Sequence, residues 1–359
     1  MKVAHPWHFS RQSLAETYLE TLKTGPQSLA IFAERRKGKT EFLNYDLTPM
    51  ALDRGYRCAY INFWEDRPNP VTCVVNGIER SMRSELSGML RGWKKEVSLK
   101  LGGIQAKLSK EPDLSPSSAN AALDCLMRPS GDVLLMCDEV QHLATDPAFE
   151  DFTASLRTFI DNNKTRVRVV FTGSSQDNLN RLFKNQRAAF YNSASITPFP
   201  DMDIEFVRFL SARFYSLTRR KLAASEIMRV FVEHHYSPAL VVELLQVMVR
   251  DGFYDIESGL AHLYALNPPD EEHRITWASL SALDKEVVKF LNQPNPAPLY
   301  TAETYKTISE ALGVSVGQGA IQASLKRLRD KSILISIGRG QWEFENKGFK
   351  NYVVSLMEE

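Results

Sequence analysis

Short apolar runs separated by amphipathic segments fill the first 200 residues. The run at 133–137, Val-Leu-Leu-Met-Cys, has five consecutive apolar residues. A strand without polar alternation is buried on both faces, as the strands of a parallel sheet are. Helical spacing between the runs indicates crossover helices. We therefore predict an α/β fold with a parallel sheet. The predicted strands are 28–33, 57–64, 133–138, 167–175 and 194–198. The predicted helices are 10–24, 41–47, 71–90, one that ends at 126, and 151–162.

The pattern changes beyond residue 200. Residues 203–266 have helical spacing throughout and predict about four helices, with Pro238 placed to start the last long one. The polar, proline-bearing stretch that follows, 267–272, reads as a linker. We therefore predict three domains: an α/β core at 1–200, an α-helical lid at 201–270 and a smaller domain at 271–359.

The last of these domains has the pattern of a winged helix-turn-helix. Helical spacing at 283–291, 304–312 and 320–331 precedes two short strands around the turn Gly338-Arg339-Gly340. In such a domain one helix enters the major groove of double-stranded DNA, and the wing contacts the minor groove or a phosphate. Many winged helices bind protein instead, and the pattern leaves both partners open. The candidates for DNA contact are Ser315, Gln318, Gln322, Ser324, Lys326, Arg327 and Arg339.

A phosphate-binding loop is predicted directly after the first strand. Residues 33–40 read Ala-Glu-Arg-Arg-Lys-Gly-Lys-Thr, which matches the pattern G-x-x-x-x-G-K-[ST] except that Ala33 replaces the first glycine. In a strand–loop–helix context, backbone N–H groups and the helix N-terminus face the phosphates. Lys39 would reach the β- and γ-phosphates, and the Thr40 hydroxyl would bind Mg²⁺.

A pair of acids provides the partner motif about a hundred residues downstream. Asp138 and Glu139 end the buried run at 133–137, where unpaired carboxylates would be costly to bury. Asp138 fits the residue that holds Mg²⁺, and Glu139 fits the general base that orients the attacking water. The two motifs in this order predict a nucleotide site.

Hydroxyl and guanidinium groups follow the strand at 167–175. Ligands of parallel sheets lie at the carboxyl ends of the strands. Thr172, Ser174 or Ser175 could therefore sense the γ-phosphate, and the spacing does not choose among them. Arg181 or Arg187 could project into the nucleotide of a neighbouring subunit in a homo-oligomer and stabilise charge in the transition state.

One other segment leaves two alternatives open, and a second predicts a hairpin. The extended aromatic segment at 5–9, His-Pro-Trp-His-Phe, either covers the base of a nucleotide or packs under the sheet. Residues 95–109 alternate apolar and polar positions around Gly102-Gly103, which predicts a β-hairpin.

Composition narrows the class of protein. Of 359 residues, 43% are hydrophobic and 24% charged, which is typical of a soluble globular chain. The net charge of +1 argues against a globally basic nucleic-acid coat. No run approaches the roughly 20 apolar residues that span a bilayer, and the N-terminus has no apolar signal segment. We expect a cytoplasmic protein without membrane contact. The four cysteines have no metal-ligand spacing.

With these motifs assembled, the chain resembles the archaeal-type ATPases of the P-loop STAND/AAA+ superfamily. The matches are the loop 35–40, the strand end Asp-Glu-Val-Gln at 138–141, Thr-Gly-Ser-Ser at 172–175 and Arg-Ala-Ala-Phe-Tyr at 187–191. Tyr-Ser-Pro at 236–238 is similar to a Gly-x-Pro motif of the lid, with Tyr236 in place of the glycine.

This resemblance implies ATP and Mg²⁺ as ligands and a winged helix controlled by the nucleotide state. Glu139, Lys39 and Arg187 would be catalytic, and Thr40 and Asp138 would hold the metal. The alternative is a nucleotide-gated regulator or scaffold that hydrolyses little and binds DNA or protein. The implied nucleotide-binding residues are Arg35, Arg36, Lys37, Gly38, Lys39, Thr40, Glu41, Ser174 and Pro238.

Overall fold

The computed structural model describes residues 5–85, 116–268, 271–293, 296–338, 340–345 and 347–358. The chain forms two compact units: Met1–Ser174 with Asn178–Glu243, and Ser175–Asp177 with Leu244–Glu359. The hairpin predicted at 95–109 and the wing residue Arg339 lie outside the described residues.

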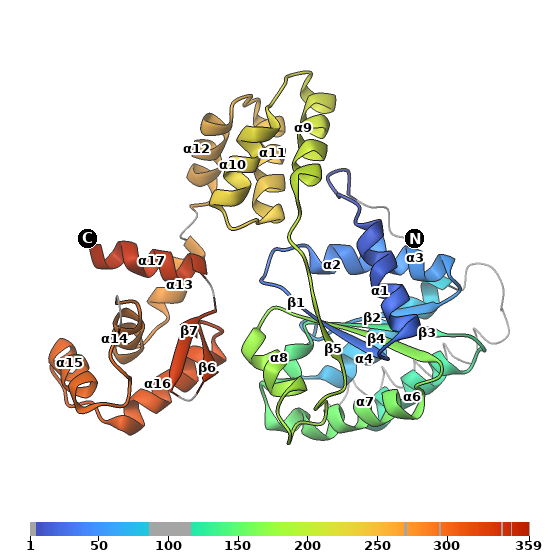
Figure 1. The fold of residues 1–359 in the computed structure, drawn as a ribbon, viewed down its shortest axis with the longest axis horizontal. Coiled ribbons are helices and arrows are strands. Elements are labelled where there is room, and N and C mark those ends of the chain that lie inside the picture. The colour runs from blue at the N-terminus through green and yellow to red at the C-terminus, as the bar shows by residue number, and fades with distance from the viewer. Residues whose placement is uncertain are drawn as a thin grey trace. The chain divides into compact units, whose positions relative to one another are not determined.

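A five-stranded parallel sheet forms the centre of the first unit (Figure 1). The strand order is β2-β3-β4-β1-β5, and all four pairings are parallel. The carboxyl ends of β1, β3 and β4, which carry the predicted motifs, are therefore adjacent. This confirms the predicted α/β fold with a parallel sheet. The strands are β1 Ser28–Phe32, β2 Arg57–Asn62, β3 Val133–Asp138, β4 Val167–Gly173 and β5 Ser195–Pro198.

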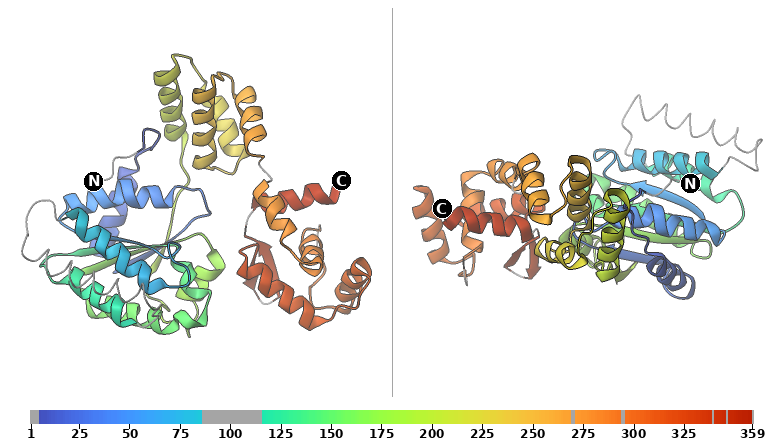
Figure 2. Two further views of the ribbon diagram at one scale, coloured as in Figure 1. Left: turned by 180° about the vertical axis from the view of Figure 1, so that it is seen from behind. Right: turned by 90° about the horizontal axis from the view of Figure 1, so that it is seen from above.

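Helices cover both faces of this sheet (Figures 1 and 2). In β3, Leu134 and Met136 pack into the apolar cluster beneath α1–α3, whereas Leu135 and Cys137 pack into the cluster beneath α4, α6 and α7. All six residues of β3 are buried, which explains the unbroken apolar run in the sequence. The helices are α1 Gln12–Thr24, α2 Lys39–Phe42, α3 Thr48–Asp53, α4 Pro70–Glu85, α6 Pro116–Met127, α7 Glu150–Asn162 and α8 Gln176–Phe183.

The helix after the phosphate-binding loop is less regular than the pattern predicted. Its first turn, α2, passes into a π-helical turn at Leu43–Leu47 before α3 begins. This turn buries Asp46, which accepts hydrogen bonds from residues near the N-terminus. Single π-helical turns are frequent at functional sites.

Four helices follow the sheet, as predicted for residues 203–266. They are α9 Ile204–Thr218, α10 Ala224–Glu233, α11 Pro238–Asp251 and α12 Ile256–Leu266. Pro238 is the first residue of α11, where its missing N–H leaves no hydrogen bond unmade. The second unit begins within α11, at Leu244.

The C-terminal part of the second unit consists of helices and a β-hairpin that pack around one hydrophobic core. This core contains Val287 of α14, Ile308 of α15, and Ile321 and Leu325 of α16. The antiparallel hairpin β6–β7 follows α16. The elements are α13 Glu271–Ala278, α14 Ala282–Leu291, α15 Ala302–Leu312, α16 Gln318–Asp330, β6 Leu334–Gly338, β7 Gln341–Phe344 and α17 Lys347–Glu358.

Candidate nucleotide-binding site

The loop between β1 and α2 has the backbone geometry of a phosphate-binding loop. Gly38 caps the N-terminus of α2 with φ +86°, a left-handed conformation that glycine adopts without strain. Arg36 is also left-handed, with φ +65°. The residue that departs from the pattern, Ala33, is buried, and its N–H donates to the Gly173 carbonyl at the end of β4 (3.4 Å).

Lys39 lies buried inside this loop. Its Nζ donates to the carbonyl of Ala33 and to that of Glu34 (2.9 Å). Burial lowers the pKa of Lys39, and the carboxylates of Glu139 and Asp138 act in the opposite direction. A desolvated ammonium attracts an anion much more strongly than one in water. The loop therefore places a strong phosphate ligand at its centre.

Asp138 connects the loop to the sheet. Its Oδ2 accepts hydrogen bonds from Thr40 Oγ1 and Tyr60 Oη, both at 2.7 Å. Its Oδ1 accepts from Thr172 Oγ1 and from the N–H of Glu139 (3.1 Å). Burial raises the pKa of Tyr60, and the Asp138 carboxylate raises it further, so the hydroxyl stays protonated and donates. Four donors compensate for the complete burial of this carboxylate.

The hydroxyl of Thr40 and the carboxylate of Asp138 suit a magnesium ion. Both are hard oxygen ligands, and Mg²⁺ in nucleotide sites is held by a few such ligands together with phosphate oxygens. Their oxygens already lie 2.7 Å apart. These two side chains are therefore the residues that would hold Mg²⁺.

Glu139 is held by two polar side chains. Its Oε2 accepts from Ser174 Oγ (2.9 Å) and from Gln141 Nε2. Gln141 is buried, and its Oε1 has no hydrogen-bond partner in the described part of the chain. A Cβ at Gly173 would lie 2.6 Å from that Oε1, so a larger residue there would displace the Gln141 side chain. Of the three predicted sensor hydroxyls, Thr172 contacts Asp138 and Ser174 contacts Glu139.

A pocket of about 290 Å³ opens beside the loop. Its lining combines a polar set, residues 35–41 and Glu139, with a largely apolar set. The apolar set includes Pro238, Ala239 and Val242 of α11. The pocket therefore offers cations for phosphates next to an apolar wall for a flat base. The remaining lining residues are His5, Trp7, Phe9, Met202 and Phe206.

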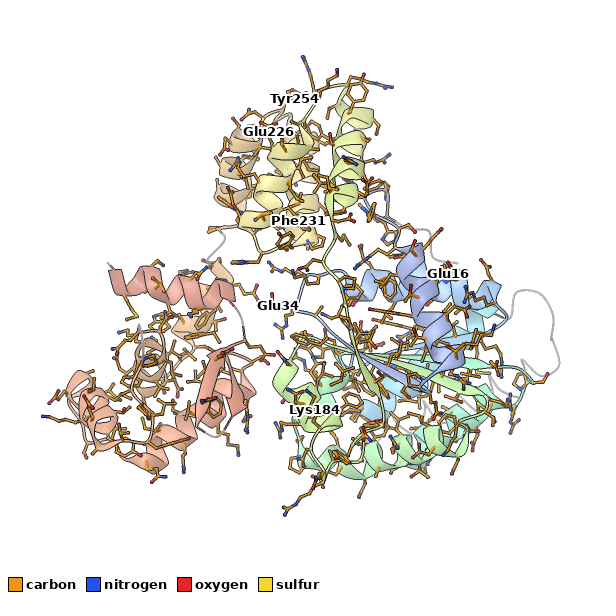
Figure 3. All side chains as sticks on the ribbon, viewed as in Figure 1. Glu16, Glu34, Lys184, Glu226, Phe231 and Tyr254 are labelled. Carbon is orange, nitrogen blue, oxygen red and sulfur yellow. The ribbon has the colours of Figure 1, made fainter. Side chains whose placement is uncertain are left out.

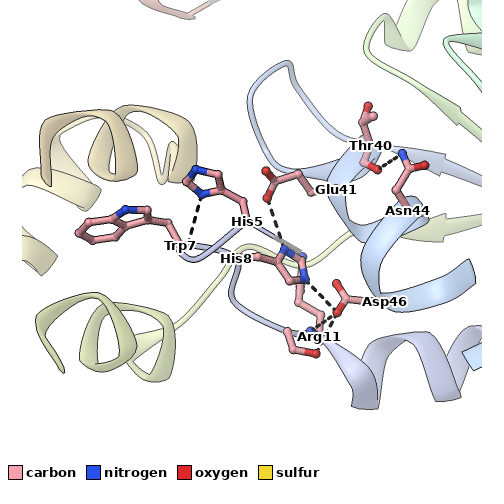
Figure 4. A network of polar contacts seen from close by, with 9 residues as sticks. His5, Trp7, His8, Arg11, Thr40, Glu41, Asn44 and Asp46 are labelled. Atoms are coloured by element: carbon pink, nitrogen blue, oxygen red, sulfur yellow. Dashed lines mark hydrogen bonds and ion pairs between the residues drawn. The ribbon is translucent and has the colours of Figure 1, made fainter. Parts of the chain in front are cut away.

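The N-terminal aromatic segment belongs to this pocket. Phe9 packs against Phe206, with ring centroids 5.7 Å apart. His8 ties the segment to α2 and the π-helical turn, because its ring nitrogens contact Asp46 (3.1 Å) and Glu41 (3.4 Å), as Figure 4 shows. Burial alone would lower the pKa of His8, but the hydrogen bonds and charges of Asp46 and Glu41 raise it to about 9. Of the two alternatives for this segment, the geometry matches the cover over the pocket.

The arginines of the loop and of the region after β4 lie differently. Arg35 lines the pocket, and its guanidinium stacks over Trp64 at 4.7 Å from the ring centroid. Arg187 is exposed, in the turns between α8 and β5, and is not among the lining residues. Arg181 donates to Asn178 within α8 (3.2 Å). Within one chain, neither Arg181 nor Arg187 completes the pocket.

In the second unit, one of the side chains expected to face DNA is inaccessible. Ser324 is fully buried and donates to Asp284 Oδ1 (2.6 Å). Its prediction as a DNA contact is wrong, since a core residue of α16 cannot reach a groove. Arg327 Nη2 also donates to Asp284 Oδ1 (2.6 Å), so this guanidinium is engaged within the unit. The remaining candidates Ser315, Gln318, Gln322 and Lys326 are exposed.

Two residues of the site were missed in the sequence, whereas Gln141 belongs to the Asp-Glu-Val-Gln match at 138–141. Tyr60 has no spacing signal, because it reaches Asp138 through the parallel pairing of β2 and β3. His8 belongs to the aromatic segment at 5–9 that the sequence analysis considered, but its partner Asp46 lies 38 residues away.

Among the described helices, none is long and apolar enough to cross a membrane.

Comparisons with known proteins show similarity at the level of the fold. Models of protein families and curated proteins give no match. Among solved structures, the Walker-type ATPase PABY2304 of Pyrococcus abyssi is similar with a TM-score of 0.57 and 15% identity, over 97% of this chain and 96% of that one. The ADP form of the Aeropyrum pernix ORC2 protein is similar with a TM-score of 0.57 and 13% identity, over 97% and 94% of the two chains. The chain therefore shares its fold with these two proteins.

Proposed function

We propose that this chain binds ATP with Mg²⁺ in the pocket beside the loop and hydrolyses it. The observation that carries the proposal is the convergence of Lys39, Thr40, Asp138 and Glu139 at the carboxyl end of one parallel sheet. Neighbours of similar fold support it, since one is a Walker-type ATPase and the other was solved in ADP and in ADPNP–ADP forms. Fold-level analogy is only supporting evidence.

Each residue of the site has a role in this proposal. The loop from Arg35 to Glu41 binds the phosphates, with Lys39 at their negative charge. Thr40 and Asp138 hold Mg²⁺, whose chemistry is to neutralise charge on the phosphates. Glu139 takes a proton from the attacking water, and Ser174 lies beside it as the sensor hydroxyl. Pro238 and the N-terminal aromatic segment cover the base.

Arg187 is proposed as a finger that acts in a neighbouring copy. Its exposure and its absence from the pocket lining suit a role between subunits. This proposal requires a homo-oligomer.

The rest of the chain is proposed to respond to the nucleotide. In this division, residues 1–200 are the core, 201–270 the lid and 271–359 a winged helix. Helices α14–α16 followed by the hairpin β6–β7 have the element order of a winged helix-turn-helix. Exposed Gln318, Gln322 and Lys326 on α16 suit contact with double-stranded DNA, while a protein partner is the alternative. The nucleotide state would control that contact.

Titration calorimetry with ATP and Mg²⁺ tests the proposal. The parent protein should bind, and Lys39→Ala should abolish binding while the chain stays folded, because the loop loses its buried cation while the apolar clusters on both faces of the sheet are untouched. Lys221→Ala, an exposed lysine outside the pocket, is the matched control. A Lys39→Ala variant that binds ATP as the parent does would overturn the assignment of the loop.

A further inference from the structure

Lys37 of the phosphate-binding loop is fastened to the start of α11 and to the segment before α9. Its Nζ donates to Asp201 Oδ1 (2.7 Å), to the His235 carbonyl (2.7 Å) and to the Tyr236 carbonyl (3.2 Å). The ammonium also lies 5.8 Å from the centroid of the Tyr236 ring. Only 13% of the Lys37 side chain is exposed.

These contacts use every donor that Lys37 has. An ammonium carries three N–H groups and no acceptor, and three oxygens receive them here. In this arrangement no donor remains for a phosphate, unlike Lys39 in the same loop. Lys37 is therefore a link between two parts of the pocket.

The turn that receives Lys37 has a strained backbone. His235 and Tyr236, between α10 and α11, both have φ +54° although neither is glycine. A left-handed backbone is unfavourable for a residue other than glycine, so two such residues in succession need support from their surroundings. The Tyr236 N–H donates to the Phe231 carbonyl (2.7 Å), and the two rings meet edge to face (Phe231 is labelled in Figure 3). Lys37 provides the support from the other side, through both carbonyls.

The position of this turn determines one wall of the pocket. Pro238 and Ala239 follow Tyr236 after one residue, Ser237, and Val242 lies one turn further along α11. Pro238, Ala239 and Val242 all line the pocket. A shift of the turn would move this wall relative to the loop that carries Lys37. The Lys37 side chain thus joins the phosphate-binding loop to the apolar wall of the pocket.

We propose that Lys37 is a positioning residue that couples the phosphate-binding loop to the wall over the base, through a latch formed by Lys37, Asp201, His235 and Tyr236. This inference rests on the proposed nucleotide site. Coupling of this kind is reciprocal. A nucleotide that orders the loop therefore also stabilises the turn, and a loosened turn weakens binding of the nucleotide.

Asp201→Asn and Lys37→Met test the latch from its two ends, with Lys221→Met as the control lysine. The probes are ATP and inorganic tripolyphosphate, which has the phosphates but no base. Asp201→Asn keeps an acceptor but loses the charge that strengthens this hydrogen bond, whereas Lys37→Met removes the donor. Weakening of a charged hydrogen bond corresponds to about tenfold weaker binding. We expect a Kd for ATP about tenfold higher in both latch variants, an unchanged Kd for tripolyphosphate in Asp201→Asn, and faster hydrogen exchange at the Tyr236 amide in both.

Two results would overturn the latch. One is an Asp201→Asn protein that binds ATP and exchanges at Tyr236 as the parent does. The other is loss of tripolyphosphate binding in Lys37→Met alone, which would make Lys37 a direct phosphate ligand. If the parent binds neither ligand, the proposed nucleotide site fails instead, and hydrogen exchange of the ligand-free proteins still tests the latch.

Discussion

Replacing Tyr60 by Phe removes one hydrogen bond from a carboxylate that is completely buried. Tyr60 Oη donates to Asp138 Oδ2 at 2.7 Å, and Asp138 retains three other donors. A hydrogen bond to a charged group contributes about 1.5–3 kcal/mol. Because the ring is kept and no large cavity forms, we expect a loss of about 2 kcal/mol in the free energy of unfolding.

Thermal unfolding measures this loss. For a unit of this size, 1 kcal/mol shifts the melting temperature by about 2–4 °C, so Tyr60→Phe should lower it by about 4–8 °C. Tyr56→Phe is the matched control, because Tyr56 lies just before β2 and its hydroxyl has no hydrogen bond to the described residues. Since Thr40 still contacts Asp138, the variant should retain binding of ATP with Mg²⁺.

A shift below about 2 °C would refute this reasoning, because it would correspond to less than about 1 kcal/mol. Asp138 would then be held sufficiently by its other donors. An equal shift in Tyr56→Phe would show instead that any hydroxyl removed near β2 has this effect. In either case the Tyr60 hydroxyl would not specifically stabilise the buried Asp138 carboxylate.

Two further predictions concern charge. The pKa of His8 is raised to about 9 by Asp46 and Glu41. The stabilising contribution of protonated His8 is therefore complete below about pH 6.5 and is lost as the pH rises through about 9. The melting temperature of the parent should fall over this window relative to that of His8→Gln, and parallel curves for the two proteins would contradict this prediction. If α16 binds DNA, the slope of log affinity against log salt concentration should flatten by about 0.9 in Lys326→Ala. The slope should not change in the control Lys306→Ala on α15. Titration of fluorescent duplex DNA measures both slopes, and equal slopes would remove Lys326 from the DNA contacts.

The sequence was most informative where the chemistry lies in one continuous segment. The loop at 33–40 and the acids at 138–139 could be recognised because neighbouring residues carry out neighbouring tasks. The buried run before Asp138 also placed these acids at the end of a parallel strand, which the structure confirms.

Residues that act across the fold could not be predicted in this way. Lys37 resembles any other basic residue of the loop until its partners, 164 to 199 residues away, are known. Ser324 has the spacing of a polar residue on a helix, yet it is buried because Asp284 of α14 provides an acceptor. Polar side chains that are buried and hydrogen-bonded to each other are exceptions to the pattern in which polar positions face solvent.

The contacts of Glu139 leave one oxygen of the proposed general base available. Ser174 and Gln141 both donate to Oε2, which orients the side chain, and Oε1 can accept a proton from water. This geometry suits the hydrolysing enzyme. The alternative is a nucleotide-gated regulator that hydrolyses little.

Hydrolysis by Glu139→Gln distinguishes these alternatives and tests the central claim most directly. The amide keeps the shape of the side chain but cannot accept the proton. With ATP and Mg²⁺ at saturation, we expect binding as in the parent and release of phosphate slower by about a hundredfold or more. Equal rates in the two proteins, or a parent that releases no phosphate with or without duplex DNA, would contradict the assignment of this chain as an ATP-hydrolysing enzyme.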